Sequence, residues 1–126
     1  MTTILLVEDN EMNRDMLCRR LKRRGYTILI AVDGNDGLTT ARDRRPDIIL
    51  LDMSLPTMDG WEVARQIKQD KVTAMIPVIG LSAHAMDSDR QKALEVGCND
   101  YESKPIDFER LISKIDKLTG NSGQEG

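Results

Sequence analysis

Short, uninterrupted apolar runs recur along the chain, and most are rich in branched aliphatic side chains. Four runs are clear and a fifth is weaker; they lie at residues 4–7, 28–32, 48–51, 78–81 and 100–103. A strand that is covered on both faces needs apolar side chains on both, so such runs are typical of strands buried in a parallel sheet. The pattern therefore predicts five central strands.

The segments between these runs have the spacing of amphipathic helices. Apolar side chains recur three and four residues apart over residues 12–21, 61–67 and 111–118. We expect these stripes to pack on the sheet, with Met12 and Met16 filling the core rather than binding a cofactor.

Capping residues and glycines mark where helices begin and end. Asp59 and Asp107 precede two of the apolar stripes as N-caps, and glycines at 25, 97 and 120 stand where helices are expected to stop. Residues 33–44 form a weaker helical segment because they include two glycines.

Strands and helices alternate along the chain, with about 20–25 residues in each unit. This alternation predicts right-handed crossovers and an α/β fold in which helices cover both faces of one parallel sheet. Five such units fill residues 1–119, which we expect to form a single domain. Residues 120–126 contain no apolar side chain, so we expect them to form a disordered tail.

Length and composition exclude several protein classes. The chain has 126 residues, of which 40% are hydrophobic and 31% charged, as in globular domains rather than disordered chains. Its apolar runs are far shorter than a membrane-spanning helix and its start lacks the features of a signal peptide, so we expect a cytoplasmic protein without membrane contact. Cys18 and Cys98 indicate neither a disulfide framework nor a zinc site.

The charge of the chain gives little support to nucleic-acid binding, because the net value is −3. One segment differs from the rest: residues 11–24 carry six basic and two acidic side chains. This segment is either a solvated helix face or a docking surface for a protein partner, and the charge pattern alone leaves both interpretations open.

Polar side chains follow four of the five predicted strands. Glu8 and Asp9 come after the first run, Asp52 after the third, Ser82 after the fourth and Lys104 after the fifth. An isolated acidic residue at a strand end is usually a helix cap or a solvated group. Because the carboxyl ends of parallel strands meet at one edge of the sheet, we expect all five side chains to converge there.

Three clustered carboxylates repel one another unless a cation neutralises them. A set of oxygen ligands without histidine or cysteine favours Mg²⁺, which commonly binds phosphate oxygens as well. Lys104 and Ser82 suit the charge and hydrogen-bonding needs of a phosphoryl group. The sequence has no glycine-rich nucleotide-binding motif. A side chain is therefore the candidate acceptor, and Asp52 ends the most apolar strand.

Four motifs, in this order and spacing, resemble the receiver domain of two-component response regulators, the CheY-like family. The motifs are ILLVEDN at 4–10, PDIILLDMSLPTMDG at 46–60, LSA at 81–83 and DYESKP at 100–105. The resemblance extends from Thr3 to about Leu118. It implies a doubly wound, five-stranded parallel sheet in the order 2-1-3-4-5 with five helices.

The resemblance also implies a function in two-component signal transduction. The Asp52 carboxylate would accept a phosphoryl group from the phosphohistidine of a histidine kinase or a histidine phosphotransfer protein. Mg²⁺ would be held by Asp9, Asp52 and the main-chain carbonyl of Ser54. Glu8 would reach the metal through water.

By the same resemblance, Ser82 and Tyr101 form a conformational switch. The hydroxyl would move to a phosphoryl oxygen and the aromatic ring would turn inward, although a half-buried strand aromatic is an equal interpretation of Tyr101 from sequence alone. A downstream protein target would then recognise the altered surface of the fourth helix, fifth strand and fifth helix. The Lys104–Pro105 bond is typically cis in this family, which would aim Lys104 into the site.

The expected protein is a stand-alone phosphoacceptor, a monomer or weak dimer, rather than an enzyme. Its own chemistry would be limited to self-phosphorylation and self-dephosphorylation. A magnesium-dependent phosphohydrolase is an alternative, but such an enzyme would need a second acid where Ser54 stands. A module that is never phosphorylated is a further alternative that the complete acceptor set disfavours. A receiver excised from a hybrid kinase stays open.

Three positions depart from the family's usual pattern. Ser82 stands where threonine is commoner, and Gly80 should weaken the packing of the fourth strand. Ser54 is a small residue beside the expected phosphorylation site, which leaves the lifetime of an aspartyl phosphate open. We expect His84, two residues after Ser82, to tune that lifetime rather than to act as a catalyst.

Overall fold

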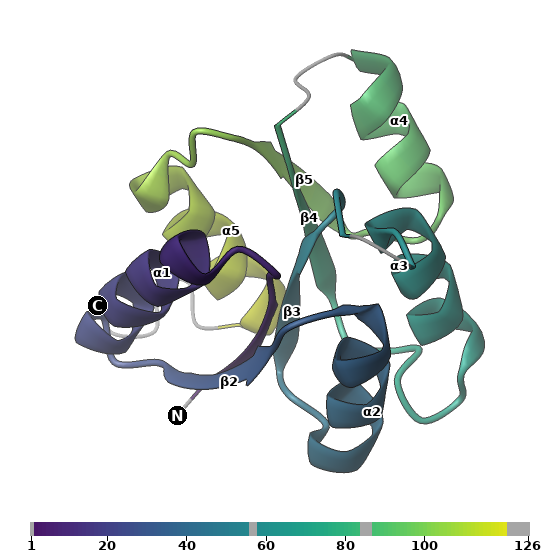
Figure 1. Ribbon diagram of the computed structural model, residues 1–126, viewed down its shortest axis with the longest axis horizontal. Helices are drawn as coiled ribbons and strands as arrows, with labels where there is room; N and C mark the ends of the chain where they lie inside the picture. The colour runs from purple at the N-terminus through teal and green to yellow at the C-terminus, as the bar shows by residue number, and fades with distance from the viewer. Residues whose placement is uncertain (1, 56–57, 84–86, 121–126) are drawn as a thin grey trace.

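The computed structural model describes residues 2–55, 58–83 and 87–120, and these contain one five-stranded parallel sheet (Figure 1). The strands are β1 (Thr3–Val7), β2 (Thr27–Ala31), β3 (Ile48–Asp52), β4 (Val78–Ser82) and β5 (Asp100–Ser103). Their order is β2-β1-β3-β4-β5, and every neighbouring pair is parallel. The five predicted strands and the predicted strand order are therefore confirmed.

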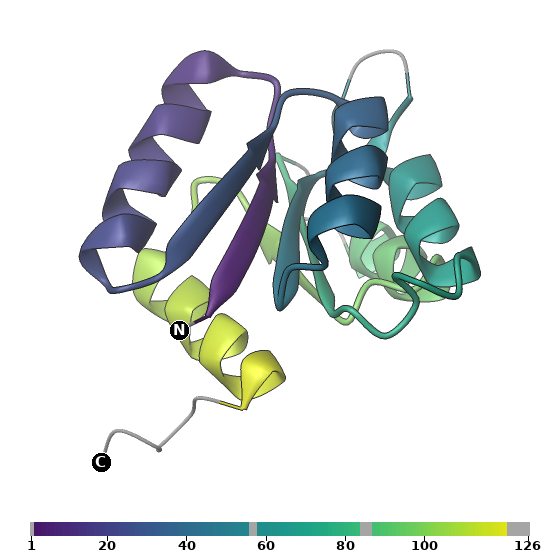
Figure 2. The same cartoon turned by 90° about the horizontal axis from the view of Figure 1, so that it is seen from below.

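Helices cover both faces of this sheet. They are α1 (Glu11–Arg23), α2 (Gly34–Arg44), α3 (Gly60–Gln69), α4 (Asp87–Glu95) and α5 (Phe108–Thr119). Figure 2 shows α1 and α5 on one face and α2, α3 and α4 on the other. This arrangement confirms the predicted doubly wound α/β fold. Among the described residues, no helix combines the length and the apolar character that crossing a membrane requires.

The core consists of two apolar layers separated by the sheet. Leu6 and Leu50 contribute to the layer under α1 and α5, whereas Leu5 and Leu51 contribute to the layer under α2, α3 and α4. All five residues of β3 are buried because this strand lies in the middle of the sheet. Asp52, its last residue, therefore emerges from the centre of the core.

Short polar side chains begin four of the helices. Asn10, Asp33, Asp59 and Asp107 each accept a hydrogen bond from the backbone amide three residues later, as N-caps do. The predicted caps at Asp59 and Asp107 are confirmed. The weak segment is also helical, and its Gly37 lies so close to Val7 that an added Cβ would be 3.1 Å from a valine methyl carbon.

The predicted burial of Met12 and Met16 is wrong. Met12 is 81% exposed and Met16 is 48% exposed. The face of α1 that packs on the sheet carries Leu17, Cys18 and Leu21 instead. At 100° per residue, the two methionines project from the opposite side of the helix. The apolar residues at 12–21 therefore lie on two different faces of α1, and only one of these faces packs on the sheet.

Gly80 does not leave a gap in β4. An added Cβ would lie 3.1 Å from the Met53 sulfur and 3.5 Å from the Cys98 sulfur, so these buried side chains occupy the space beside the glycine. Cys98 is 4% exposed and is therefore a core residue. The expected weakening of the strand by Gly80 stays a prediction.

An ion-pair network joins α5 to β5, although sequence analysis did not predict it. Glu102 is only 2% exposed, and its carboxylate lies 2.8 Å from Lys114 Nζ and 3.4 Å from Arg110 Nη1. The Lys114 contact is an ion pair without hydrogen-bond alignment. Lys114 Nζ also donates to the main-chain carbonyl of Tyr101 across 2.8 Å. Two cations of α5 thus contact β5.

Arg45 adopts a left-handed conformation at the end of α2, with φ 45° and ψ 66°. We expect Arg45→Gly to stabilise the domain by about 0.5–1 kcal/mol, because glycine adopts this conformation without steric cost. Urea unfolding measures the change, and Arg44→Gly, at the last helical residue of α2, is the matched control and should destabilise. An unchanged or reduced free energy of unfolding for Arg45→Gly would contradict the prediction.

Candidate functional site

Three carboxylates converge at the carboxyl edge of the sheet. Glu8 and Asp9 follow β1 and Asp52 ends β3, and one ligand oxygen from each lies within 4.8 Å of the others. Glu8 and Asp52 are buried, at 1% and 3% exposure, whereas Asp9 is exposed to solvent. The predicted convergence of the acidic residues is confirmed.

Lys104 is the cation of this cluster. Its Nζ lies 3.3 Å from Glu8 Oε1 and 3.6 Å from Asp52 Oδ1. The Lys104–Pro105 peptide bond is cis, as the resemblance implies, and the Lys104 amide donates to the Ser82 carbonyl across 2.6 Å. The loop after β5 is therefore joined to the end of β4, and the ammonium reaches the carboxylates from that side.

Ser82 and Tyr101 occupy neighbouring strands. Ser82 is the last residue of β4 and is 1% exposed, and Asp52 is in register with the residue before it, Leu81. Tyr101 lies in β5, is 6% exposed and belongs to the apolar layer under α2, α3 and α4. The ring is thus buried rather than half-buried. Its movement on phosphorylation stays a prediction.

The loop after β3 is held close to the carboxylate. The Ser54 amide donates to Asp52 Oδ1 across 3.0 Å, and the Met53 amide donates to the Leu81 carbonyl across 2.8 Å. Gly60, at the start of α3, approaches the same loop so closely that an added Cβ would lie 2.7 Å from the Asp52 carbonyl oxygen. The Ser54 side chain is exposed to solvent.

The turn after β1 is held in a similar way. The Asn10 amide donates to Glu8 Oε2 across 3.2 Å, and Arg14 Nη1 donates to the Glu8 main-chain carbonyl across 3.1 Å. Sequence analysis missed both residues as parts of the site. The cap pattern before α1 was a usable signal for Asn10, whereas no sequence signal distinguishes Arg14 from the other arginines of the helix.

Burial and, to a smaller extent, the neighbouring Asp52 make Glu8 a weaker acid. Its pKa is raised from 4.5 to about 7, chiefly because burial disfavours the charged form and then because of the hydrogen bond to Asp52 and its negative charge. Lys104 and the Asn10 amide offset only part of this rise. A divalent cation among these oxygens would relieve the repulsion, so the donor set fits Mg²⁺.

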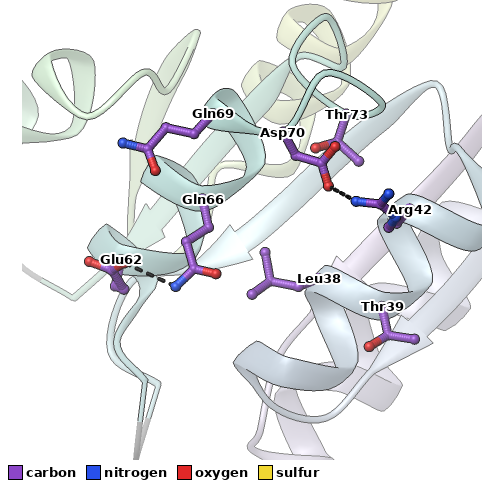
Figure 3. A pocket seen from close by; sticks show the side chains of 8 residues that line it. All are labelled: Leu38, Thr39, Arg42, Glu62, Gln66, Gln69, Asp70 and Thr73. Atoms are coloured by element: carbon purple, nitrogen blue, oxygen red, sulfur yellow. Dashed lines mark hydrogen bonds and ion pairs between the residues drawn. The ribbon is translucent and has the colours of Figure 1, made fainter.

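A cavity of about 510 Å³ lies elsewhere, between α2 and α3 (Figure 3). It is lined by Leu38, Thr39, Arg42, Glu62, Gln66, Gln69, Asp70 and Thr73, and its Arg42–Asp70 ion pair is 2.5 Å long. None of these residues belongs to the acidic cluster. We place the candidate site at the edge of the sheet because the three clustered carboxylates and the Lys104 ammonium lie there together.

A doubly wound sheet with this acidic cluster and lysine at its carboxyl edge defines a CheY-like domain. Residues 4–116 match the family of the response regulator receiver domain. The chain belongs to this family, which confirms the resemblance inferred from the motifs. It is a response regulator receiver domain of the two-component class, a family of signalling domains.

Relatives of known identity agree with this assignment. The polar-differentiation response regulator DivK of Brucella anthropi is 37% identical over 120 residues, which cover 95% of this chain and 98% of DivK. The receiver domain of a sensor histidine kinase from Pseudomonas aeruginosa, solved with a magnesium ion in its active site cleft, is 34% identical, with a TM-score of 0.87 and coverage of 94% and 98%. A putative response regulator from Chloroflexus aurantiacus is 28% identical, with a TM-score of 0.90 and the same coverage.

Receiver domains bind Mg²⁺ at an acidic site and interact with kinases or phosphotransfer proteins and with downstream targets. Two sequence-based expectations lie outside the described residues: the role of His84 and the disorder of residues 121–126. Gly120 is described and ends α5 in a left-handed conformation, with φ 80°.

Proposed function

We propose that residues 1–119 form a phosphoacceptor domain in which Asp52 receives a phosphoryl group from a phosphohistidine. The observation that supports this most directly is the position of Asp52: it is buried at the end of the central strand, beside Glu8 and Asp9 and 3.6 Å from the Lys104 ammonium. A carboxylate in such a setting is a nucleophile with a fixed orientation.

The transfer forms one bond and breaks another. An oxygen of Asp52 forms a P–O bond as the P–N bond of the phosphohistidine breaks, and the electron pair stays on the imidazole nitrogen. Asp52 Oδ1 accepts the Ser54 amide and lies near Lys104, and these contacts orient the carboxylate. Lys104 and the Ser82 hydroxyl then stabilise the phosphoryl oxygens.

Mg²⁺ would be held by Asp9, Asp52 and the main-chain carbonyl of Ser54, with Glu8 acting through a water molecule. When bound, the ion supplies positive charge that neutralises the carboxylates and the phosphoryl oxygens. Asp9 is the exposed member of the set and gives access from solvent, whereas the buried pair Glu8 and Asp52 fixes the inner side of the site.

Phosphorylation would change the surface of α4, β5 and α5 through Ser82 and Tyr101. A downstream protein target would recognise that surface, and the basic α1 would dock the kinase or phosphotransfer protein. We expect no nucleic-acid or membrane contact and at most a weak dimer. Catalysis would be limited to the domain's own phosphorylation and dephosphorylation. Phosphohydrolase activity is not supported, because Ser54 provides no acid for a leaving group.

Acetyl phosphate tests the proposal without a cognate kinase. With Mg²⁺, intact mass spectrometry should detect the addition of one phosphoryl group, and a chelator should slow this addition strongly. Asp9→Asn should slow it on the order of tenfold, because one charged metal ligand is lost. Asp43→Asn, which changes an exposed acid of α2, is the matched control. Equal rates with and without chelator would contradict the metal assignment.

A further inference from the structure

A guanidinium group lies against the turn that supplies two of the three clustered carboxylates. Arg14, in the first turns of α1, is half-buried, and its Nη1 donates to the main-chain carbonyl of Glu8 across 3.1 Å. The bond is made to the backbone rather than to a carboxylate. This contact is therefore a hydrogen bond to the backbone and not an ion pair.

The bond fixes the orientation of a peptide plane. The Glu8 carbonyl lies beyond the end of β1, where regular strand pairing stops. It belongs to the rigid peptide unit that joins Glu8 to Asp9, so holding its oxygen also holds the amide nitrogen and Cα of Asp9. One hydrogen bond from Arg14 thus constrains the backbone of two residues that contribute to the acidic cluster.

Asp9 depends on this constraint because burial does not hold it. Its side chain is exposed, whereas Glu8 and Asp52 are enclosed by the core. On the far side of Asp9, the Asn10 amide donates to Glu8 Oε2 across 3.2 Å, and Asn10 Oδ1 accepts the Asn13 amide across 3.0 Å. Arg14 and Asn10 therefore hold the turn from both sides of Asp9.

We propose that Arg14 is a positioning residue for divalent-cation binding: its guanidinium holds the Glu8–Asp9 peptide so that the two carboxylates face Asp52. This inference rests on the metal site proposed above. The change in Mg²⁺ affinity that it predicts on removal of Arg14 is opposite in sign to the change that charge alone would cause. Removing a cation near the site would by itself favour Mg²⁺, whereas loosening the turn disfavours it.

Calorimetric titration of Mg²⁺ into the full chain separates the two effects. We expect Arg14→Ala to weaken Mg²⁺ binding on the order of tenfold, as is usual when a partner that orients a metal ligand is lost. Arg14→Lys keeps the positive charge and a group that can donate hydrogen bonds, so it should retain part of the affinity. Arg19→Ala removes the same charge from an exposed position on α1 and should bind like the wild type.

The outcomes distinguish this inference from the metal site itself. If the wild type binds no Mg²⁺, the metal site is wrong and the role of Arg14 is wrong with it. If the wild type binds but Arg14→Ala binds equally well or more tightly, only the role of Arg14 is wrong. Thermal unfolding in metal-free buffer shows whether each variant is folded, and Arg14→Lys provides the comparison if the alanine variant is not.

A double-mutant cycle tests whether Arg14 acts through Asp9. In the Asp9→Asn background, Arg14→Ala should cause little further loss of Mg²⁺ affinity, because the ligand that Arg14 positions is already impaired. A full tenfold loss in both backgrounds would overturn the proposed route. Loss of affinity that accompanies general unfolding would appear in both backgrounds alike, so the cycle also excludes a merely structural effect.

Discussion

Asp52→Asn is expected to abolish phosphoryl incorporation from acetyl phosphate. The amide has nearly the same shape as the carboxylate but lacks the negatively charged oxygen that attacks phosphorus. It also removes one partner of Lys104, which lies 3.6 Å from Asp52 and 3.3 Å from Glu8. Intact mass spectrometry after incubation with Mg²⁺ measures the loss, and peptide mapping of the phosphorylated wild type locates the modified residue.

Two controls make the Asp52 result specific. Asp43→Asn changes the same chemical group at an exposed position on α2 and should be phosphorylated like the wild type. Thermal unfolding should show a folded Asp52→Asn variant, since the substitution leaves the volume of the buried side chain almost unchanged. Equal phosphoryl incorporation in Asp52→Asn and the wild type would refute the proposed acceptor.

Gly60→Ala is expected to cause the largest loss of stability among the substitutions considered, on the order of 3 kcal/mol. An alanine Cβ would lie 2.4 Å from Met53 Cα and 2.7 Å from the Asp52 carbonyl oxygen, and both are backbone atoms. The loop after β3 must therefore move. Phosphorylation should slow as well, because Asp52 directly precedes that loop. Urea unfolding and the rate of phosphoryl incorporation measure the two effects.

Gly80→Ala is the matched control for this prediction. Its Cβ would also meet Met53, but at 3.1 Å and at the sulfur of a flexible side chain. That side chain can shift, so we expect a loss below about 1 kcal/mol. If the two alanine variants lose the same stability, the close approach of Gly60 to the backbone does not determine its role.

The fold was largely predictable because burial on both faces leaves a local signature. The run at 48–51 is entirely apolar, and β3 is entirely buried. Where an element is buried on only one side, the pattern of apolar residues does not show which of them are buried. Met12 and Met16 show helical spacing, yet they project away from the sheet, because spacing alone does not tell which face of α1 is covered. Ile30 of the edge strand β2 is likewise 40% exposed despite its apolar run.

The site was predictable for a topological reason. Parallel strands deliver the residues that follow them to one edge, so Glu8, Asp52 and Lys104 had to meet there. The supporting contacts were not predictable. Arg14 reaches the Glu8 carbonyl through a long side chain, and Glu102 is paired with a lysine of α5. Such pairings depend on side-chain direction and reach, which the order of residues does not state.

The pairing of α5 with β5 has a consequence for the self-association of the sheet. β5 is an edge strand, and an exposed edge presents backbone groups to which a strand of another molecule can add. Lys114 donates to the Tyr101 carbonyl, so one of those acceptors is already engaged by a charged side chain. An incoming strand would have to displace this ammonium and leave Glu102 with a poorer partner. The lysine therefore protects this edge against intermolecular strand addition and the aggregation that would follow.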